Sequence, residues 1–280
     1  MKKISRRSFL AAAAVSAAAL ALTACGGSAS TASSAAASSV AASSEAASTS
    51  AAAAELTTVE AGKLTMATNA TFPPYEMTTD AGTIEGIDVD TAKAIAEKLG
   101  LELQIDDMDF DAALLSVQQG KADIVMAGVT VTDERKAVMD FSDSYATGIQ
   151  SIIVPNDSDI ASPDDLAGKT IGTQRGTTGY IYCSDDFGDE NVVAYDDGLT
   201  AVQALNNGQV DAVVIDNAPA QEFVAANPGL KVLDTSYAEE DYAIGVAKGS
   251  ALEDAVNKAL EELKADGTLQ AIVDKYINAN

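Results

Sequence analysis

The chain has 280 residues and a formal net charge of −25, because 42 Asp and Glu outnumber 17 Lys and Arg. This acidity excludes a general nucleic-acid-binding protein, which needs a surplus of basic side chains to contact phosphates. There is no His and there are only two Cys. Catalytic groupings that depend on His, four-ligand zinc sites and disulfide-rich scaffolds are therefore excluded. No metal and no cofactor are expected.

The first 24 residues have the pattern of an export signal. Four basic residues within the first seven positions precede a short apolar stretch at 9–22, which is too short and too rich in Ala for a good transmembrane helix. The Leu-Thr-Ala-Cys run that ends at Cys25 resembles the lipobox of bacterial lipoproteins. The resemblance implies a signal peptide at 1–24 and a lipid, such as palmitate, on Cys25. An ordinary signal peptide with a chance Cys is the alternative.

Residues 26–54 consist of Gly, Ala, Ser and Thr, apart from Val40 and Glu45. With almost nothing to bury, such a segment cannot offset the entropy lost on ordering, and we interpret it as a flexible tether. The range 25–59 is thus predicted to be a lipidated tether before the globular part.

The globular part begins with alternating strands and helices. Strands are predicted at 63–67, 101–105 and 122–127 from their apolar or alternating patterns. A helix at 90–99 stops at Gly100, and a second helix, which Asp109 can cap, ends at Gly120. The order strand, helix, strand, helix, strand predicts a parallel sheet.

A similar pattern recurs further along the chain. Strands are predicted at 169–173, 192–195 and 210–215, with a helix at 198–207. The residues around Gly120 and Asp123 match those around Gly208 and Asp211 at an offset of 88, including the apolar run that follows. Two such units suggest two lobes of similar build.

The ends of the matched strands indicate a ligand site, because parallel strands end at the crevice where α/β proteins bind ligands. The first strand leads into Gly128 and Thr130, which would offer an exposed backbone N–H and a hydroxyl, with Arg135 close behind. The second strand leads into Asp216. A guanidinium on one wall and a carboxylate on the other suit a zwitterion.

Several motifs resemble, in order and spacing, those of extracellular solute-binding proteins for polar amino acids. They are Ala67–Glu76 (ATNATFPPYE), Gly86–Asp90 (GIDVD), Gly120–Asp123 (GKAD), Ala127–Arg135 (AGVTVTDER), Phe141-Ser142, Gly172–Thr178 (GTQRGTT) and Asp211-Ala212 leading to Asp216. The resemblance spans about residues 60 to 278. It implies the type II periplasmic-binding-protein fold, in which two α/β lobes with mostly parallel sheets are joined by two hinge strands. Lobe 1 would hold 60–147 and 243–280, and lobe 2 would hold 148–242.

The resemblance also implies a role for each residue of the site. Arg135 would pair with the ligand carboxylate, with help from Gly128 and Thr130, and the acid at 216 would take the ammonium group. Further ligand contacts would come from Asn69, Phe72, Phe110, Ala127, Gln174 and Thr178. Structural alternatives stay open: Arg135 as a solvated helix charge, Asp216 as a cap before Pro219, Thr130 as a turn residue and Phe72 as core.

The function that follows is a non-catalytic receptor outside the cytoplasm. It would capture a free amino acid, polar and not strongly basic because Asn69 is neutral, and deliver it to an ABC-type permease. It would be a monomer, anchored to the cell membrane through Cys25. The alternative is a dehydratase-like enzyme for small carboxylic acids on the same fold, with Glu76 or Asp216 as acid and base. A sensory module and an adhesin fit the sequence less well.

Overall fold

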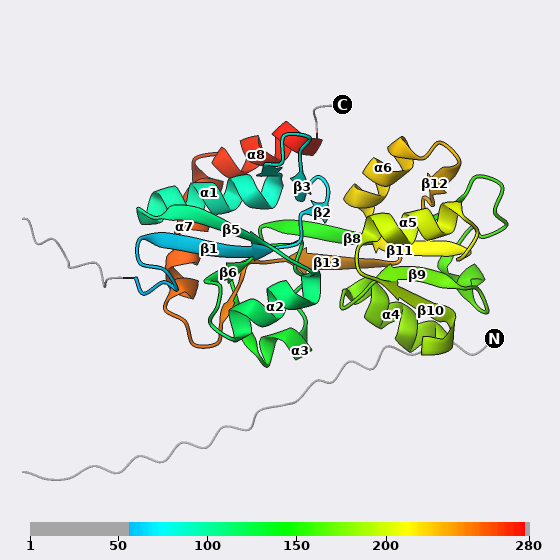
Figure 1. Cartoon of the computed structure of the whole chain (residues 1–280), viewed down its shortest axis with the longest axis horizontal. Helices are drawn as coiled ribbons and strands as arrows, with labels where there is room; N and C mark the ends of the chain where they lie inside the picture. Colours follow the sequence, from blue (N-terminus) through cyan, green and yellow to red (C-terminus); the bar gives the residue numbers. More distant parts are fainter. Residues whose placement is uncertain (1–55, 278–280) are drawn as a thin grey trace, which may run out of the picture. The chain divides into compact units, whose positions relative to one another are not determined.

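The repeated strand–helix pattern folds into two main sheets in the computed structural model, which describes residues 56–277 (Figure 1). The predicted signal peptide, Cys25 and nearly all of the predicted tether lie outside the described residues. The first sheet has the strand order β5-β1-β6-β14-β7. Its strands are β1 (Lys63–Thr68), β5 (Glu102–Asp107), β6 (Ile124–Val125), β7 (Met139–Phe141) and β14 (Gly245–Ala247).

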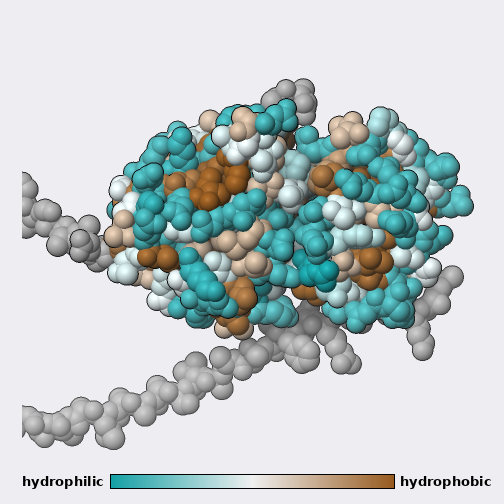
Figure 2. All heavy atoms as spheres, in the orientation of Figure 1, coloured by the Kyte–Doolittle hydropathy of each residue, from teal (hydrophilic) through white to brown (hydrophobic). Residues whose placement is uncertain are grey.

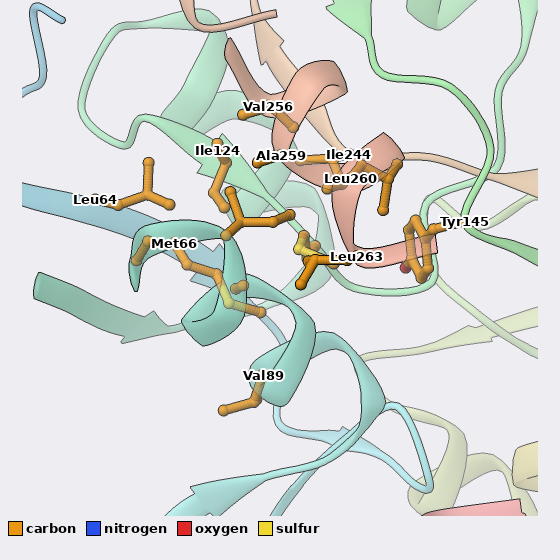
Figure 3. Close-up of a cluster of buried hydrophobic side chains, with 14 of the residues drawn as sticks. Leu64, Met66, Val89, Ile124, Tyr145, Ile244, Val256, Ala259, Leu260 and Leu263 are labelled. Atoms are coloured by element: carbon orange, nitrogen blue, oxygen red, sulfur yellow. The ribbon is translucent and has the colours of Figure 1, made fainter. Parts of the chain in front are cut away.

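Helices cover both faces of the first sheet, because successive residues of β1 and β6 point to opposite sides. Leu64, Met66 and Ile124 pack on one face with α1 (Ile87–Leu99), α7 (Leu252–Ala265) and α8 (Thr268–Ile277) (Figure 3). Ala67 and Val125 pack on the other face with α2 (Phe110–Gln118). The short helix α3 (Asp133–Lys136) follows β6. The C-terminal helices therefore pack in the core of the first sheet.

The second sheet has the strand order β10-β9-β11-β8-β12, and β13 also pairs with β8. Its strands are β8 (Ala146–Pro155), β9 (Ile171–Gln174), β10 (Val192–Tyr195), β11 (Ala212–Asp216), β12 (Leu230–Val232) and β13 (Ala238–Tyr242). The helices of this half are α4 (Thr178–Phe187), α5 (Gly198–Asn206) and α6 (Asn217–Ala226), with 3-10 turns at Pro163–Leu166 and Asp189–Asn191. Two buried clusters, one on each face, fill the space between sheet and helices. Cys183 is fully buried and free in one of them.

The chain passes between the two sheets twice, once between β7 and β8 and once between β13 and β14. The two crossing strands are themselves paired, since Ala146–Gln150 of β8 runs antiparallel to Ala238–Tyr242 of β13. Such paired crossings form the two-strand hinge that the sequence resemblance implies. The lobe boundaries chosen from the sequence stay a prediction.

The sheets differ from the prediction in being mixed. The matched units are parallel as expected, with β1 between β5 and β6 and with β9 between β10 and β11. The returning strand β14 and the long strand β8, in contrast, pair antiparallel with their neighbours. Sequence periodicity gives no direction to a strand that arrives from the other sheet, so only the local units were predictable.

Two elements differ in length from their predictions by more than one residue. Helix α1 begins at Ile87 and not at Asp90, because Ile87, Asp88 and Val89 are buried and extend its packed face by one turn. Strand β6 contains only Ile124 and Val125, although a strand was expected over 122–127.

Hydrophilic side chains cover most of the face in Figure 2, with separate hydrophobic patches between them, which agrees with the acidic composition.

Candidate functional site

A cavity lies where the carboxyl ends of β6 and β11 approach each other. Its lining residues come from both sheets and from the crossing strands. They are Asn69, Phe72, Glu76, Phe110, Ala127, Gly128, Thr130, Arg135, Gln150, Gln174, Thr177, Thr178, Ile215, Asp216 and Tyr242. All ten candidate ligand-binding residues chosen from the sequence are among them.

Arg135 is held in this cavity by the short helix α3. The Thr132 side chain caps the helix by accepting a hydrogen bond from the Arg135 backbone N–H at 3.2 Å. The buried guanidinium donates from Nη1 to the Thr130 carbonyl at 2.7 Å and from Nη2 to the Gly176 carbonyl at 3.1 Å. It also lies 5.4 Å from the centre of the Phe110 ring, in cation–π range. Burial lowers the pKa of Arg135.

Gly128 occupies the cavity wall but does not offer a free backbone N–H, contrary to the sequence-based expectation. Its N–H donates to the Asp88 carboxylate of α1 at 3.0 Å. The backbone has a φ of +55° here, a left-handed conformation that Gly adopts without strain. The loop after β6 is thus tied to α1, and its donor toward the cavity is the Arg135 guanidinium.

Hydrogen bonds cross the cavity from the first sheet's side to the second. Gln174 Nε2 donates to Asn69 Oδ1 at 3.0 Å, and the hydroxyls of Thr130 and Thr178 lie 3.4 Å apart. The Arg135 bond to the Gly176 carbonyl is a third connection. These contacts bring the two sides of the site together, so the described structure is a closed arrangement.

Asp216 is the last residue of β11 and lines the same cavity as Arg135. Its Oδ2 accepts from the Ile149 N–H at 2.7 Å, and its Oδ1 accepts from the Ala218 N–H at 3.0 Å as the cap of α6. The capping role that the sequence left open is therefore present, in addition to a place at the cavity. Burial raises the pKa of Asp216 to about 6, although the two backbone hydrogen bonds oppose this shift.

The aromatic side of the cavity comes from a small sheet of β2 (Thr71–Phe72), β3 (Glu76–Thr78) and β4 (Ile84–Glu85). Phe72 stacks on Tyr75 with ring centres 5.7 Å apart, and Tyr75 meets Tyr242 edge to face at 5.5 Å. Phe72 is only half-buried. A ring with an open face at a cavity can pack against the apolar part of a ligand.

Sequence reasoning did not assign Gln150, Thr177, Ile215 or Tyr242 to the site, and it left Glu76 undecided. Ile215 could have been found, because it matches Ala127 in the 88-residue repeat. Gln150 and Tyr242 belong to the crossing strands β8 and β13. These strands lie outside the 88-residue repeat, so the repeat could not indicate them.

Glu240 is a further buried acid that sequence reasoning missed. It lies on β13, and its Oε2 accepts from the Thr130 hydroxyl at 3.0 Å and from Gln150 Nε2 at 2.9 Å. A carboxylate in this position links the loop after β6 to both crossing strands.

Within residues 56–277, no group of three or more acidic or Cys side chains is arranged to hold a metal ion.

The fold and the cavity together define a two-lobe solute-binding protein. A family model described as bacterial extracellular solute-binding proteins, family 3, matches residues 64–279. The chain belongs to this family. Among the residues that the structure describes, no helix is long and apolar enough to cross a membrane.

Similar proteins support the same assignment. The L-cystine-binding protein TcyJ of Escherichia coli strain K12 is 33% identical over 225 residues, which cover 79% of this chain and 85% of TcyJ. The ABC transporter arginine-binding protein 1 of the same strain is 32% identical over 222 residues, covering 77% of this chain and 91% of that protein.

An ancestral arginine-binding protein has been solved both with glutamine and with arginine bound. Both structures are 43% identical to this chain with a TM-score of 0.74, covering 77% of this chain and 98% of theirs. The predicted two-lobe fold and the predicted class, an amino-acid-binding receptor of ABC transport, are confirmed by these matches. The matched relatives are binding proteins, and the dehydratase alternative has no support among them.

Proposed function

We propose that this protein binds a free α-amino acid as a zwitterion in the cavity between its two sheets. The ligand carboxylate pairs with Arg135 and accepts from the Thr130 hydroxyl, which turns from Glu240 to the ligand, while the ammonium group donates to Asp216. One observation carries the proposal: within residues 56–277, neither Arg135 nor Asp216 forms a salt bridge, although both are buried. A buried charge is costly without a partner, and a zwitterion supplies one for each.

The ligand side chain extends toward Phe72, Asn69 and Gln174 in this proposal. The two amides satisfy each other across the cavity at 3.0 Å, and a polar side chain with both donors and acceptors can take the place of that bond. Gly128, Ala127, Phe110 and Thr178 complete the wall. The prediction that the ligand is not strongly basic rested on the neutrality of Asn69, and it must be weighed against the acid at Glu76, which also lines the cavity.

Ligand capture then serves delivery to an ABC-type permease. Closure of the two sides around the ligand adds crossing contacts of the kind seen between Gln174 and Asn69. A permease that reads the closed surface would accept the loaded form, because only a ligand with differential affinity for the closed state shifts the population toward it. The protein acts as a monomer in this scheme, which light scattering of the purified chain would check.

The lipid anchor is the second part of the proposal. Cys25 carries the lipid, and the Gly-, Ala-, Ser- and Thr-rich stretch after it keeps the receptor near the membrane while allowing it to move. Replacing Cys25 by Ser should release the protein from the membrane fraction into the extracytoplasmic fluid. Unchanged membrane attachment of the C25S protein would refute the anchor without affecting the binding site.

Ligand binding is tested by a thermal-shift screen of the purified protein against the twenty amino acids, cystine and small carboxylic acids. A ligand that binds only the folded state raises Tm by mass action. At a ligand concentration of 100 times Kd, it adds about 2.7 kcal/mol to the free energy of unfolding. At least one α-amino acid should raise Tm, and its decarboxylated and deaminated analogues should not. If no amino acid shifts Tm, the proposal fails. Recovery of the ligand unchanged after incubation separates a receptor from an enzyme.

A further inference from the structure

Two buried acidic residues lie close together near the cavity, because the Asp88 backbone N–H donates at 2.9 Å to the carbonyl of Tyr75, the residue before Glu76. Glu76 of β3 lines the cavity and is fully buried, and neither of its carboxyl oxygens has a hydrogen-bond partner. Asp88, in the first turn of α1, is also fully buried. Its Oδ2 accepts from the Gly128 N–H at 3.0 Å and from the Tyr145 hydroxyl at 2.8 Å, while its Oδ1 has no partner.

No cation balances this pair. Neither Glu76 nor Asp88 takes part in a salt bridge within the described part of the chain. The titratable groups that act on the pair or line the same cavity are Tyr75, Asp107, Tyr145, Arg135, Asp216 and Tyr242. Arg135 is the cation in this set, and it forms no salt bridge with Glu76 or Asp88. Two like charges buried together without a counter-ion are strongly unfavourable, so the pair must retain a proton.

We propose that Glu76 and Asp88 share one proton in the empty site, and that a cationic ligand side chain displaces this proton while a neutral one leaves it in place. The inference rests on the proposed amino-acid function and concerns how the same site chooses between ligand side chains. The carboxyl oxygens of Glu76 would accept hydrogen bonds from the ligand cation. Both lack a hydrogen-bond partner in the described structure, and buried polar atoms without partners are rare in folded proteins. The displaced proton passes to water, and the carboxylate left behind pairs with the ligand cation.

The direction of both pKa shifts agrees with a shared proton. Burial is the largest cause that raises the pKa of Glu76 well above its usual range, followed by the charge of Asp88. Burial also raises the pKa of Asp88 to about 6, while the bonds from Gly128 and Tyr145 hold it down. The titration belongs to the pair and not to either residue alone. A cationic ligand side chain favours the ionised form of the pair. The affinity for such a ligand therefore falls as the pH drops, because a larger fraction of the pair is then protonated.

Isothermal titration calorimetry in two buffers of different ionisation enthalpy measures the protons released on binding. The probes are L-arginine and L-glutamine, which share the same α-carboxylate and α-ammonium groups. Any proton that Asp216 releases on meeting the ammonium is common to both ligands, so the difference between them reports on Glu76 and Asp88. At pH 5 to 6 we expect arginine to release about one proton more than glutamine. The ratio of the two Kd values should then change about tenfold per pH unit in the acid range.

A variant and a matched control sharpen the result. Glu76→Gln should remove the extra proton and the pH dependence of the arginine-to-glutamine ratio, while glutamine still binds. Glu97→Gln changes an exposed acid on α1 and should behave as the unmodified protein. Equal proton release for the two probes in the unmodified protein, or failure of arginine to bind at any pH while glutamine binds, would overturn the inference. These measurements on the unmodified protein decide the matter even if the Glu76→Gln variant does not fold.

The same data separate this inference from the proposed function. If neither probe nor any other amino acid binds, the zwitterion site itself is wrong. If glutamine or another neutral amino acid binds and its affinity depends on Arg135, the zwitterion site stands, and proton release then decides the role of the acid pair alone.

Discussion

The two matched units of the sequence, α2 with β6 and α5 with β11, keep the same geometry and differ in the chemistry at their ends. Helices α2 and α5 have nine residues each, at positions 88 apart. Gly120 and Gly208 follow them with φ values of +65° and +67°. Asp123 and Asp211 then accept from the backbone N–H of Thr65 and Thr170, each at 2.8 Å.

The difference begins where the strands reach the cavity. Gly128 and Asp216 occupy equivalent positions in the two units, and both line the site. One wall therefore ends in a glycine loop that leads to Thr130 and Arg135, and the other ends in a carboxylate. A repeated scaffold that presents a cation on one side and an acid on the other can hold a ligand carrying both charges. The two units thus share their local geometry and differ in the groups at the ends of their strands.

The largest effect should come from removing the cation of the first wall. Arg135→Ala should weaken amino-acid binding by at least about 30-fold, because truncating one member of a buried charge pair costs about 2–5 kcal/mol. Arg175→Ala is the matched control, since the Arg175 side chain is 55% exposed and its ion pair with Asp196 is on the surface; it should change Kd by about twofold or less. Calorimetry gives Kd, and circular dichroism checks the fold. Similar affinities for both variants would contradict the carboxylate role.

The second prediction compares the matched acids. Asp123 is buried and accepts from two backbone N–H groups, those of Val59 and Thr65, whereas Asp211 is exposed and accepts from the N–H of Thr170. Asp123→Ala should lower the free energy of unfolding by about 2–3 kcal/mol and Asp211→Ala by about 1 kcal/mol, because hydrogen bonds to a buried charged group contribute more. Urea unfolding of the two variants measures both values. Equal losses would mean that burial does not separate the two units.

Sequence reasoning predicted the repeated units well because each is local. Apolar periodicity, a glycine after the helix and an acid before the strand lie within about twenty residues of each other. The residues after β6 and β11 lie near each other because both strands end at the cavity. All ten candidate residues line this cavity, and their roles as ligand contacts stay a prediction.

The features that the sequence did not predict depend on contacts between segments far apart in the chain. The Gly128 N–H points to Asp88, 40 residues away, and no local pattern indicates that partner. Glu240 reaches Thr130 across 110 residues, and it does so only because β13 and β8 pair between the sheets. The antiparallel strands were missed for the same reason, since their direction is set by the crossings and not by their own residues.

The third prediction tests the glycine that replaces an acid in the first unit. A Cβ at position 128 would come within 2.8 Å of Phe72 Cε1 and 3.2 Å of Tyr242 Cε2, at a φ of +55°. Gly128→Ala should therefore lower the free energy of unfolding by about 2–3 kcal/mol, from left-handed strain and crowding together. Gly120→Ala has a similar φ of +65° with nothing within 4 Å of the added Cβ, and it should lose only about 1 kcal/mol. Chemical denaturation of both variants isolates the crowding, and an equal loss would show that the aromatic rings move aside.

The smallest effect concerns the helix caps of the two units, where the geometry differs although the residue is the same. Asp197 accepts from the Thr200 N–H at 2.6 Å and from the Thr200 hydroxyl at 3.0 Å, so its side chain caps α5. Asp109 occupies the equivalent position before α2, but its side chain makes no capping bond. Asp197→Ala should lower the free energy of unfolding by about 1 kcal/mol, the usual loss for a helix cap.

Asp109→Ala is the matched control for this cap and should change the free energy of unfolding by only a few tenths of a kcal/mol, from the helix dipole alone. Differences of this size are resolved by urea unfolding at constant slope, because a change in the midpoint without a change in slope reports stability. If both variants lose about 1 kcal/mol, Asp109 caps α2 in solution and the two units are closer in geometry than the structure describes. A loss confined to Asp197→Ala would mean that only α5 is stabilised by a side-chain cap. The exposed Asp109 carboxylate then makes no capping bond at α2, next to the cavity residue Phe110.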